Sequence, residues 1–191
     1  MMNLMRTIFA GAGALALAAC ATVNDDMADT TPVLAGGAQM YPDRTIAQNA
    51  AAAPDLSTLV TALQAADLVD TLNTPGPFTV FAPTNQAFQQ VPAATLNSLL
   101  EPANKAQLQS VLTYHVVAGR VTAEDLIRQI RAGNGSAMIT TLQGEQLTAR
   151  MSGSNVVLMG KNGSMATVIA PNVTQSNGVV HVINGVLLPT M

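Results

Sequence analysis

Apolar residues recur every three to four positions between about residues 45 and 130, the spacing of helices that bury one face. One such face carries Leu108, Leu112 and His115. The spacing of Thr122 and Asp125 is that of a capping box, in which two side chains satisfy free amides at a helix start. The pattern predicts helices over Thr45–Ala53, from Asp55, over Ala93–Leu100, from an Asn104 cap and from Thr122.

From Ser136 onward apolar and polar residues alternate, and a period of two is typical of half-buried strands. The dipeptides Asn162-Gly163 and Asn177-Gly178 are typical of hairpin turns. Helices first and strands second predict an α+β fold class. The predicted strands are Met138–Leu142, Gln146–Met151, Asn155–Met159, Met165–Ala170, Val179–Ile183 and Val186–Leu188, with Val116–Ala118 as an earlier one.

The segment Thr79–Phe88 predicts a strand that passes directly into a helix. Its first residues are β-branched and aromatic, as strands prefer. Pro83 cannot donate a ladder hydrogen bond and favours an extended residue before it. Thr84 or Asn85 can then cap the helix that carries Phe88.

The first residues of the chain have the pattern of a secretory signal peptide. One basic residue, Arg6, precedes the apolar run Ile8–Leu17, which is too short to span a membrane. Leu17-Ala-Ala-Cys20 resembles the bacterial lipobox, which implies that Cys20 is lipidated and becomes the mature N-terminus. An ordinary cleavage site near Ala19 is the alternative. We therefore predict a signal peptide over residues 1–19, a lipid-anchored flexible tether over residues 20–43, and outer-membrane placement because no aspartate follows the cysteine.

Composition narrows the classes of partner. Eight basic and eleven acidic residues give a formal net charge of −3, and no basic run is present. This argues against nucleic acid as a partner and against electrostatic docking to anionic lipid. Cys20 is the only cysteine, so an intramolecular disulfide is impossible.

Residues that would carry catalysis or bind metal do not cluster along the sequence. The two histidines are far apart and have no cysteine beside them, so no zinc site is predicted. His181 sits in an alternating apolar strand and is predicted to be a packed structural residue. No paired carboxylates, phosphate-binding loop or nucleophile elbow are evident, which predicts no enzyme and no cofactor. Four methionines are predicted to fill the core rather than bind copper: Met138, Met151, Met159 and Met165.

Four segments, in order, resemble the signature regions of fasciclin-type (FAS1) domains. They are Asp55–Val60 with Asp67–Leu72, Thr79–Phe88, Leu112–Val121 and Ser176–Pro189. The resemblance covers about residues 44–189, and these bounds are the predicted domain. It implies a wedge-shaped antiparallel β-sandwich with helices packed along it, and extracytoplasmic placement.

The resemblance also marks candidate interaction residues. In some animal members an Asp-Ile pair just before the last signature has been linked to integrin binding. Asn172 and Val173 stand at the matching positions, so the carboxylate for a metal-assisted contact is missing. Tyr114 and His115 match a second segment implicated in adhesion. Because His115 lies on the apolar helix face, a buried, hydrogen-bonded histidine that closes the helix is the favoured interpretation.

These observations favour a non-enzymatic interaction or adhesion module that is tethered to the cell envelope and binds a protein or an extracellular polysaccharide. The alternative is a structural or stress-related periplasmic envelope protein without a dedicated adhesive ligand. Either would be held to the membrane through the N-terminal lipid.

Overall fold

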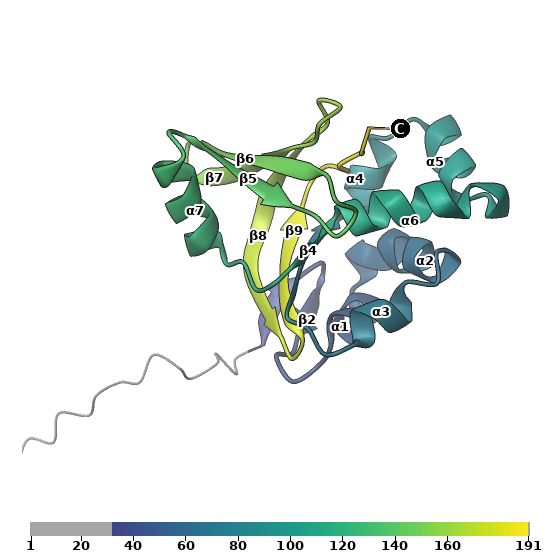
Figure 1. The fold of residues 1–191 in the computed structure, drawn as a ribbon. Coiled ribbons are helices and arrows are strands. Elements are labelled where there is room, and N and C mark those ends of the chain that lie inside the picture. The colour runs from purple at the N-terminus through teal and green to yellow at the C-terminus, as the bar shows by residue number, and fades with distance from the viewer. Residues whose placement is uncertain (1–31, 191) are drawn as a thin grey trace, which may run out of the picture.

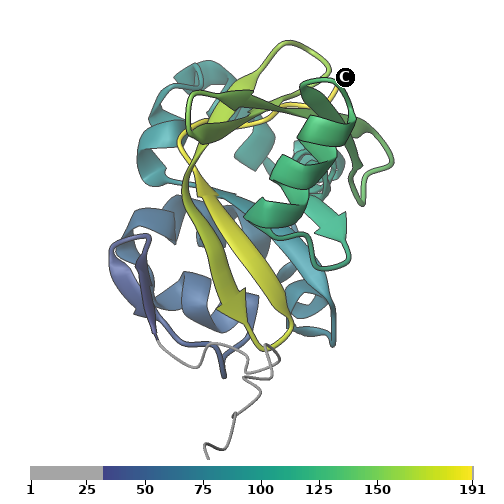
Figure 2. The same cartoon turned by 90° about the vertical axis from the view of Figure 1, so that its left-hand side faces the viewer.

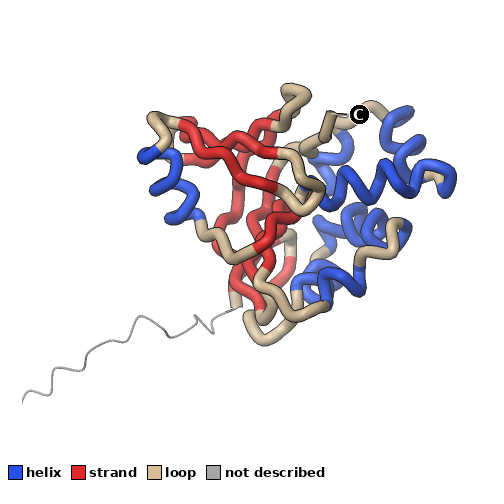
Figure 3. Tube along the Cα trace, in the orientation of Figure 1, coloured by secondary structure: helices blue, strands red, loops and turns tan. Residues whose placement is uncertain are grey.

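A layer of helices lies against one side of a bent sheet, and a single further helix lies on the other side (Figure 1; Figure 3). The computed structural model describes residues 32–190. The predicted signal peptide over residues 1–19, the lipidation of Cys20 and the predicted tether over residues 20–31 lie outside this described part.

The first described element is a small hairpin within the segment that was predicted to be a tether. β1 (Val33–Ala35) pairs antiparallel with β2 (Ala38–Met40). Ala35 and Met40 are both buried in the hydrophobic core. The prediction of a flexible tether up to residue 43 is therefore wrong for residues 33–40, because their apolar side chains pack against the hydrophobic core of the domain.

The helical layer begins and ends largely where the local sequence predicts. Thr45 caps the first helix, and Gln48 completes a capping box with it. The predicted cap at Asn104 is wrong: its side-chain amide instead donates to the Ser98 carbonyl at 2.8 Å, and it makes no cap hydrogen bond. The layer consists of α1 (Ile46–Ala52), η1 (Pro54–Leu56), α2 (Ser57–Ala65), α3 (Val69–Asn73), α4 (Asn85–Gln89), α5 (Ala93–Leu100), η2 (Pro102–Asn104) and α6 (Lys105–Tyr114).

Seven strands form one sheet in the order β4-β3-β9-β8-β7-β6-β5. Each neighbouring pair is antiparallel except β3 and β9, the second and third strands from the β4 edge, which run parallel. The α+β wedge is confirmed, but the sheet is mixed rather than wholly antiparallel. All residues of β9 are buried, as is usual for a strand covered on both faces. The strands are β3 (Phe78–Pro83), β4 (Val116–Ala118), β5 (Ser136–Thr140), β6 (Gln146–Ser152), β7 (Asn155–Met159), β8 (Met165–Gln175) and β9 (Gly178–Ile183).

A long bulged strand bends this sheet. The first part of β8 pairs with β7, and its pairing with β9 shifts register between Val168 and Ala170 and again between Ala170 and Val173. Bulges of this kind bend a strand and increase its twist. The β5–β7 strands therefore turn over the end of the β8–β9 pair, and α7 (Ala123–Ala132) lies under them (Figure 1; Figure 2).

The final segment of the chain corrects one predicted strand. Residues 186–188 form no strand. The Leu187 amide donates to Nε2 of His115 at 3.0 Å, and the Leu188 amide donates to Oγ of Ser164 at 3.0 Å. Two side chains thus satisfy the backbone groups that a strand partner would otherwise take.

The segment Thr79–Phe88 forms the predicted strand-to-helix corner, as β3 followed by α4. The Thr84 hydroxyl accepts from the Ala87 amide and caps α4. The neighbouring Asn85 does not cap α4. Its carboxamide instead accepts a hydrogen bond from the Thr58 amide and donates one to the Pro54 carbonyl. Asn85 therefore fixes α4 to the start of α2.

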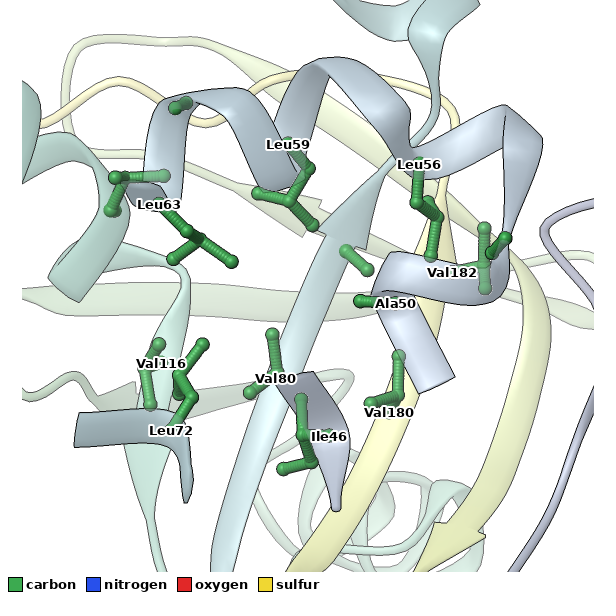
Figure 4. Packing of buried hydrophobic residues seen from close by; sticks show 14 of the residues in the cluster. Ile46, Ala50, Leu56, Leu59, Leu63, Leu72, Val80, Val116, Val180 and Val182 are labelled. Carbon is green, nitrogen blue, oxygen red and sulfur yellow. The ribbon is translucent and has the colours of Figure 1, made fainter. Parts of the chain in front are cut away.

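Two hydrophobic cores share strands β3 and β9. Val80 and Val180 face the helices, whereas Phe81 and Ile183 face the opposite side, as alternation along a strand requires. We call the first the helix-side core; it includes Ile46, Leu56, Leu59, Leu63, Leu72, Val116 and Val182 (Figure 4). We call the second the strand-side core; it includes Tyr114, Leu126, Ile130, Leu147, Leu158 and Leu187.

Candidate functional site

The bulge in β8 places Asn172 in a left-handed backbone conformation, with φ of 57°. Asparagine tolerates this conformation better than most side chains. Its amide donates to Nδ1 of His181 at 3.2 Å. Its side-chain oxygen accepts from the Ala123 amide at 2.7 Å, and its side-chain nitrogen lies 2.9 and 2.8 Å from the two carboxylate oxygens of Glu124. Asn172 therefore joins the bulge to the first turn of α7.

The start of α7 presents Glu124 at the surface. The predicted capping box is confirmed, since Thr122 and Asp125 satisfy each other's backbone amides. The pKa of Glu124 is lowered, first by the hydrogen bond from its own backbone amide and then by that from Asn172. An exposed carboxylate with a lowered pKa stays ionised through mildly acidic conditions, so this site keeps a negative charge.

His181 forms the floor beneath Asn172 and is fully buried. Its ring stacks on Phe81 with centroids 5.5 Å apart. Nε2 lies 2.9 Å from the Val121 carbonyl and must donate to it, while Nδ1 accepts from Asn172. These partners assign the neutral Nε2–H tautomer. Burial lowers its pKa, so the structural role predicted for this histidine is confirmed and both ring nitrogens are already used.

The Tyr114–His115 pair is likewise engaged inside the domain. Nδ1 of His115 donates to the Val111 carbonyl at 2.8 Å, and its Nε2 accepts from Leu187. Burial lowers the pKa of His115 to about 4. The Tyr114 hydroxyl accepts from the Lys161 amide at 3.0 Å and lies 3.4 Å from the Gln146 carbonyl. The prediction of a buried histidine that closes α6 is confirmed.

An open groove of about 240 Å³ lies between α7 and the bulged strand. Glu124 supplies a charge to its lining, and Asn155 adds a polar side chain. Ile127 and Ile169 add apolar surface, and Ile169 is 55% exposed. The groove therefore combines one fixed anion with apolar side chains, a mixture suited to binding rather than to proton transfer.

Of the four predicted interaction residues, only Asn172 lines this groove. Val173 and Tyr114 are fully buried, and His115 is 3% exposed, so these three offer no side-chain surface in this structure. Glu124 and Ile169 were missed as groove residues. The capping-box pattern explained Glu124 as part of a helix start, and no local signal shows that residues 124 and 172 meet across 48 positions.

Within residues 32–190, no group of three histidine, cysteine, aspartate or glutamate residues is placed to hold a metal ion. None of the helices described over the same range is long and apolar enough to cross a bilayer.

Comparison with known proteins identifies the fold. The family model described as "Fasciclin domain" matches residues 54–189. Protein sll1483 of Synechocystis is 48% identical over 147 residues, which cover 77% of this chain and 74% of that protein. The cell surface glycolipoprotein MPB83 of Mycobacterium bovis is 39% identical over 165 residues, which cover 84% of this chain and 66% of that protein.

A solved structure of a FAS1 domain pair from the insect cell adhesion molecule fasciclin I has the same fold. The two superpose with a TM-score of 0.69 at 20% sequence identity. The match covers 82% of this chain and 57% of the insect chain.

Proposed function

The chain belongs to the fasciclin-domain family, and we propose that it is a non-enzymatic interaction module that is tethered to the bacterial cell envelope and binds a protein or an extracellular polysaccharide. The observation that carries the proposal is the α7–β8 groove. There one candidate interaction residue, Asn172, reaches an open surface beside its partner Glu124.

The state of the histidines supports a binding role over a catalytic one. A general base needs a free ring nitrogen within hydrogen-bond reach of substrate. Both nitrogens of His115 and both of His181 face internal backbone partners. Protonation of either ring would place an N–H group opposite the backbone N–H that now donates to it, at Leu187 or Asn172. The fold therefore holds both rings neutral.

The tether is supported by the lipobox-like Leu17-Ala-Ala-Cys20 and by the name of the M. bovis relative, which describes a glycolipoprotein of the cell surface. In this proposal the lipid on Cys20 inserts in the outer membrane. The described chain starts beside the β1–β2 hairpin, at the opposite end of the domain from the β5–β7 strands (Figure 1). A domain held by this end presents the β5–β7 strands away from the membrane.

Binding is tested with the lipid-anchored protein on cells, and with the purified full chain on beads, against host matrix proteins and against exopolysaccharide of the producing cell. The variant Ile169→Asp puts a second negative charge into the groove and is expected to abolish binding. Leu34→Asp is the matched control, because Leu34 is also exposed but lies on the β1–β2 hairpin. Equal binding of parent and Ile169→Asp would remove the groove from the proposal.

If beads that carry the parent protein bind none of these surfaces more strongly than blank beads do, the proposal of an adhesion function is wrong. The domain would then fit a structural envelope protein without an adhesive ligand. Protease treatment of intact cells separates the two: an adhesin is cleaved from outside, whereas a domain that faces only the periplasm is protected.

The anchor has its own test. Cys20→Ser is expected to leave an unprocessed precursor that incorporates no labelled fatty acid. Labelling of that variant would exclude Cys20 as the lipidated residue without affecting the groove.

A further inference from the structure

Three methionines lie in one row across the outer face of strands β5 to β8. The strand registers place Met138 opposite Thr148, Thr148 opposite Met159, and Met159 opposite Met165. Directly opposite residues of neighbouring strands stand on the same face of a sheet, with Cβ atoms roughly 5 Å apart. The row therefore brings three thioethers together from three separate strands.

This row faces solvent. Met138 is 70% exposed and Met165 is 63% exposed, while Met159, directly beside Met165, is partly buried. The alternate residues Ile139 and Leu158 point the other way, into the strand-side core. The prediction that these methionines fill the core is thus wrong for Met138, Met159 and Met165, because strand alternation places all three on the outer face.

Met151 gives a contrast on the same strands. It lies one residue beyond Arg150, so alternation along β6 turns it to the inner face. There it packs against the strand-side core. Among the methionines of these strands, Met151 therefore does fill the core.

Hydrogen bonds from outside the hairpin hold the turn of the β7–β8 hairpin, which carries two of these thioethers. Met159 and Met165 flank the turn of residues 160–164. The Tyr114 hydroxyl accepts from the Lys161 amide in that turn, and Ser164 accepts from the Leu188 amide. Fixing the supporting backbone reduces the ordering cost of bringing two ligands to one ion.

A hollow of about 330 Å³ adjoins the row, and Met138 and Thr148 form part of its wall. Glu145 and Lys161 line the same hollow with opposite charges, and Arg150 lies in the neighbouring row of the sheet. This face therefore has no surplus of carboxylates for a hard divalent cation.

We propose that the row binds one soft monovalent cation, Cu(I) or Ag(I), through the sulfur atoms of Met138, Met159 and Met165. Neutral thioethers are soft ligands that favour Cu(I) over hard cations. Met138 stands two strand spacings, roughly 10 Å, from Met159. The unbranched side chain of methionine has three rotatable bonds, which lets both sulfurs lean over the shorter Thr148 toward one shared ion.

The test uses the full chain with Cys20→Ser throughout, because a free thiolate is itself a soft ligand. Ag(I), which stays monovalent, is titrated into protein with carbon-13 in its methionine methyl groups. The methyl signals of Met138, Met159 and Met165 are expected to shift together and to saturate at one ion per chain. The signal of Met151 is expected to stay in place.

The variant Met138→Leu/Met159→Leu/Met165→Leu keeps the apolar volume and removes the sulfur. It is expected to lose this saturable ion, whereas Met151→Leu keeps it. Retained binding in the triple variant overturns the proposal. The proposal is also overturned if Ag(I) does not shift the methyl signals of Met138, Met159 and Met165 in the parent protein. That outcome does not depend on whether any variant folds. Because leucine preserves apolar contact, loss of binding identifies sulfur coordination and not a hydrophobic docking surface.

Discussion

The helix-side and strand-side halves of the domain use similar apolar cores but present different surfaces. Of the large apolar side chains that are exposed among residues 32–190, Leu34 lies on the hairpin beside the helices. The other four belong to the strand-side half: Met138, Leu142, Met165 and Ile169. The α7–β8 groove and the methionine row both lie in that half. The two candidate binding surfaces therefore both lie in the strand half.

The largest expected effect tests whether the two cores are one folding unit. Phe81→Ala is expected to lower the free energy of unfolding by about 3–5 kcal/mol and Leu56→Ala by about 2–5 kcal/mol, since each empties a fully buried site. Urea unfolding followed by circular dichroism measures both. Each variant should unfold in a single transition, because β3 and β9 supply side chains to both cores.

The exposed Leu34→Ala is the control for that pair, with an expected change within about 0.5 kcal/mol. Two separate transitions in Leu56→Ala would show that the helical half unfolds on its own. The two halves would then not be one folding unit.

The next effect is a pH dependence set by the buried histidines. The pKa of His115 is about 4 in the folded chain, against 6.5 for an ordinary histidine, mainly because burial disfavours the charged ring. Between these values the unfolded chain binds a proton that the folded chain excludes. The free energy of unfolding is therefore greatest above pH 6.5 and falls toward pH 4, by roughly 3 kcal/mol in total.

Urea titrations at intervals between pH 5 and pH 7 measure this slope. His115→Gln is expected to flatten the slope whatever it does to the stability at pH 7. His181→Gln should flatten it separately, because burial also lowers the pKa of His181. Glu124 titrates below this window, since its pKa is lowered from 4.5. An unchanged slope in His115→Gln would show that this ring is charged or exposed in the folded protein.

A smaller effect concerns the edge of the groove. Asn172→Asp supplies the carboxylate found at the matching position of some animal relatives, but here it would face Glu124. We expect about 1 kcal/mol of destabilisation at pH 7, because a donor to Glu124 becomes a like charge. Combining it with Glu124→Gln should restore most of the stability, which a thermodynamic cycle measures. Additive losses in the double variant would contradict the pairing of these two residues.

An effect of similar size but opposite sign is expected in the helix-side core. Gln175 is 1% exposed, and its side-chain oxygen has no hydrogen-bond partner within the described chain. Gln175→Met replaces the amide by an apolar side chain of similar size beside Met40. We expect a gain of about 1 kcal/mol in urea unfolding, because an unpaired buried polar atom is removed. A loss of stability instead would indicate that a water molecule satisfies this oxygen.

Local patterns predicted most elements of both halves. Thr45 and Thr122 begin α1 and α7 because capping boxes act over three residues, which a short stretch of sequence reveals. The strand β7 was predicted with its observed ends, Asn155 and Met159. The strand predicted over residues 186–188 was wrong, because whether an extended segment pairs depends on a partner elsewhere in the fold.

The candidate sites could be predicted only in part. Asn172 was found through the family resemblance, but its contacts with Ala123 and Glu124 depend on a bulge that has no strong local signal. The methionine row was missed for a related reason. Alternation along each strand turns Met138 and Met165 outward, but only the register of four strands brings them into one row with Met159.

The sequence by itself determined the α+β class, the capped helices, the strand-to-helix corner at Thr84 and the family, because these depend on short-range spacing and on ordered motifs. The tertiary structure alone decided the parallel β3–β9 pairing, the burial of Tyr114 and Val173, and the placement of Glu124 beside Asn172. Each of these brings together residues far apart in the chain. Their contacts are set by how the two cores pack against shared strands, which no local pattern encodes.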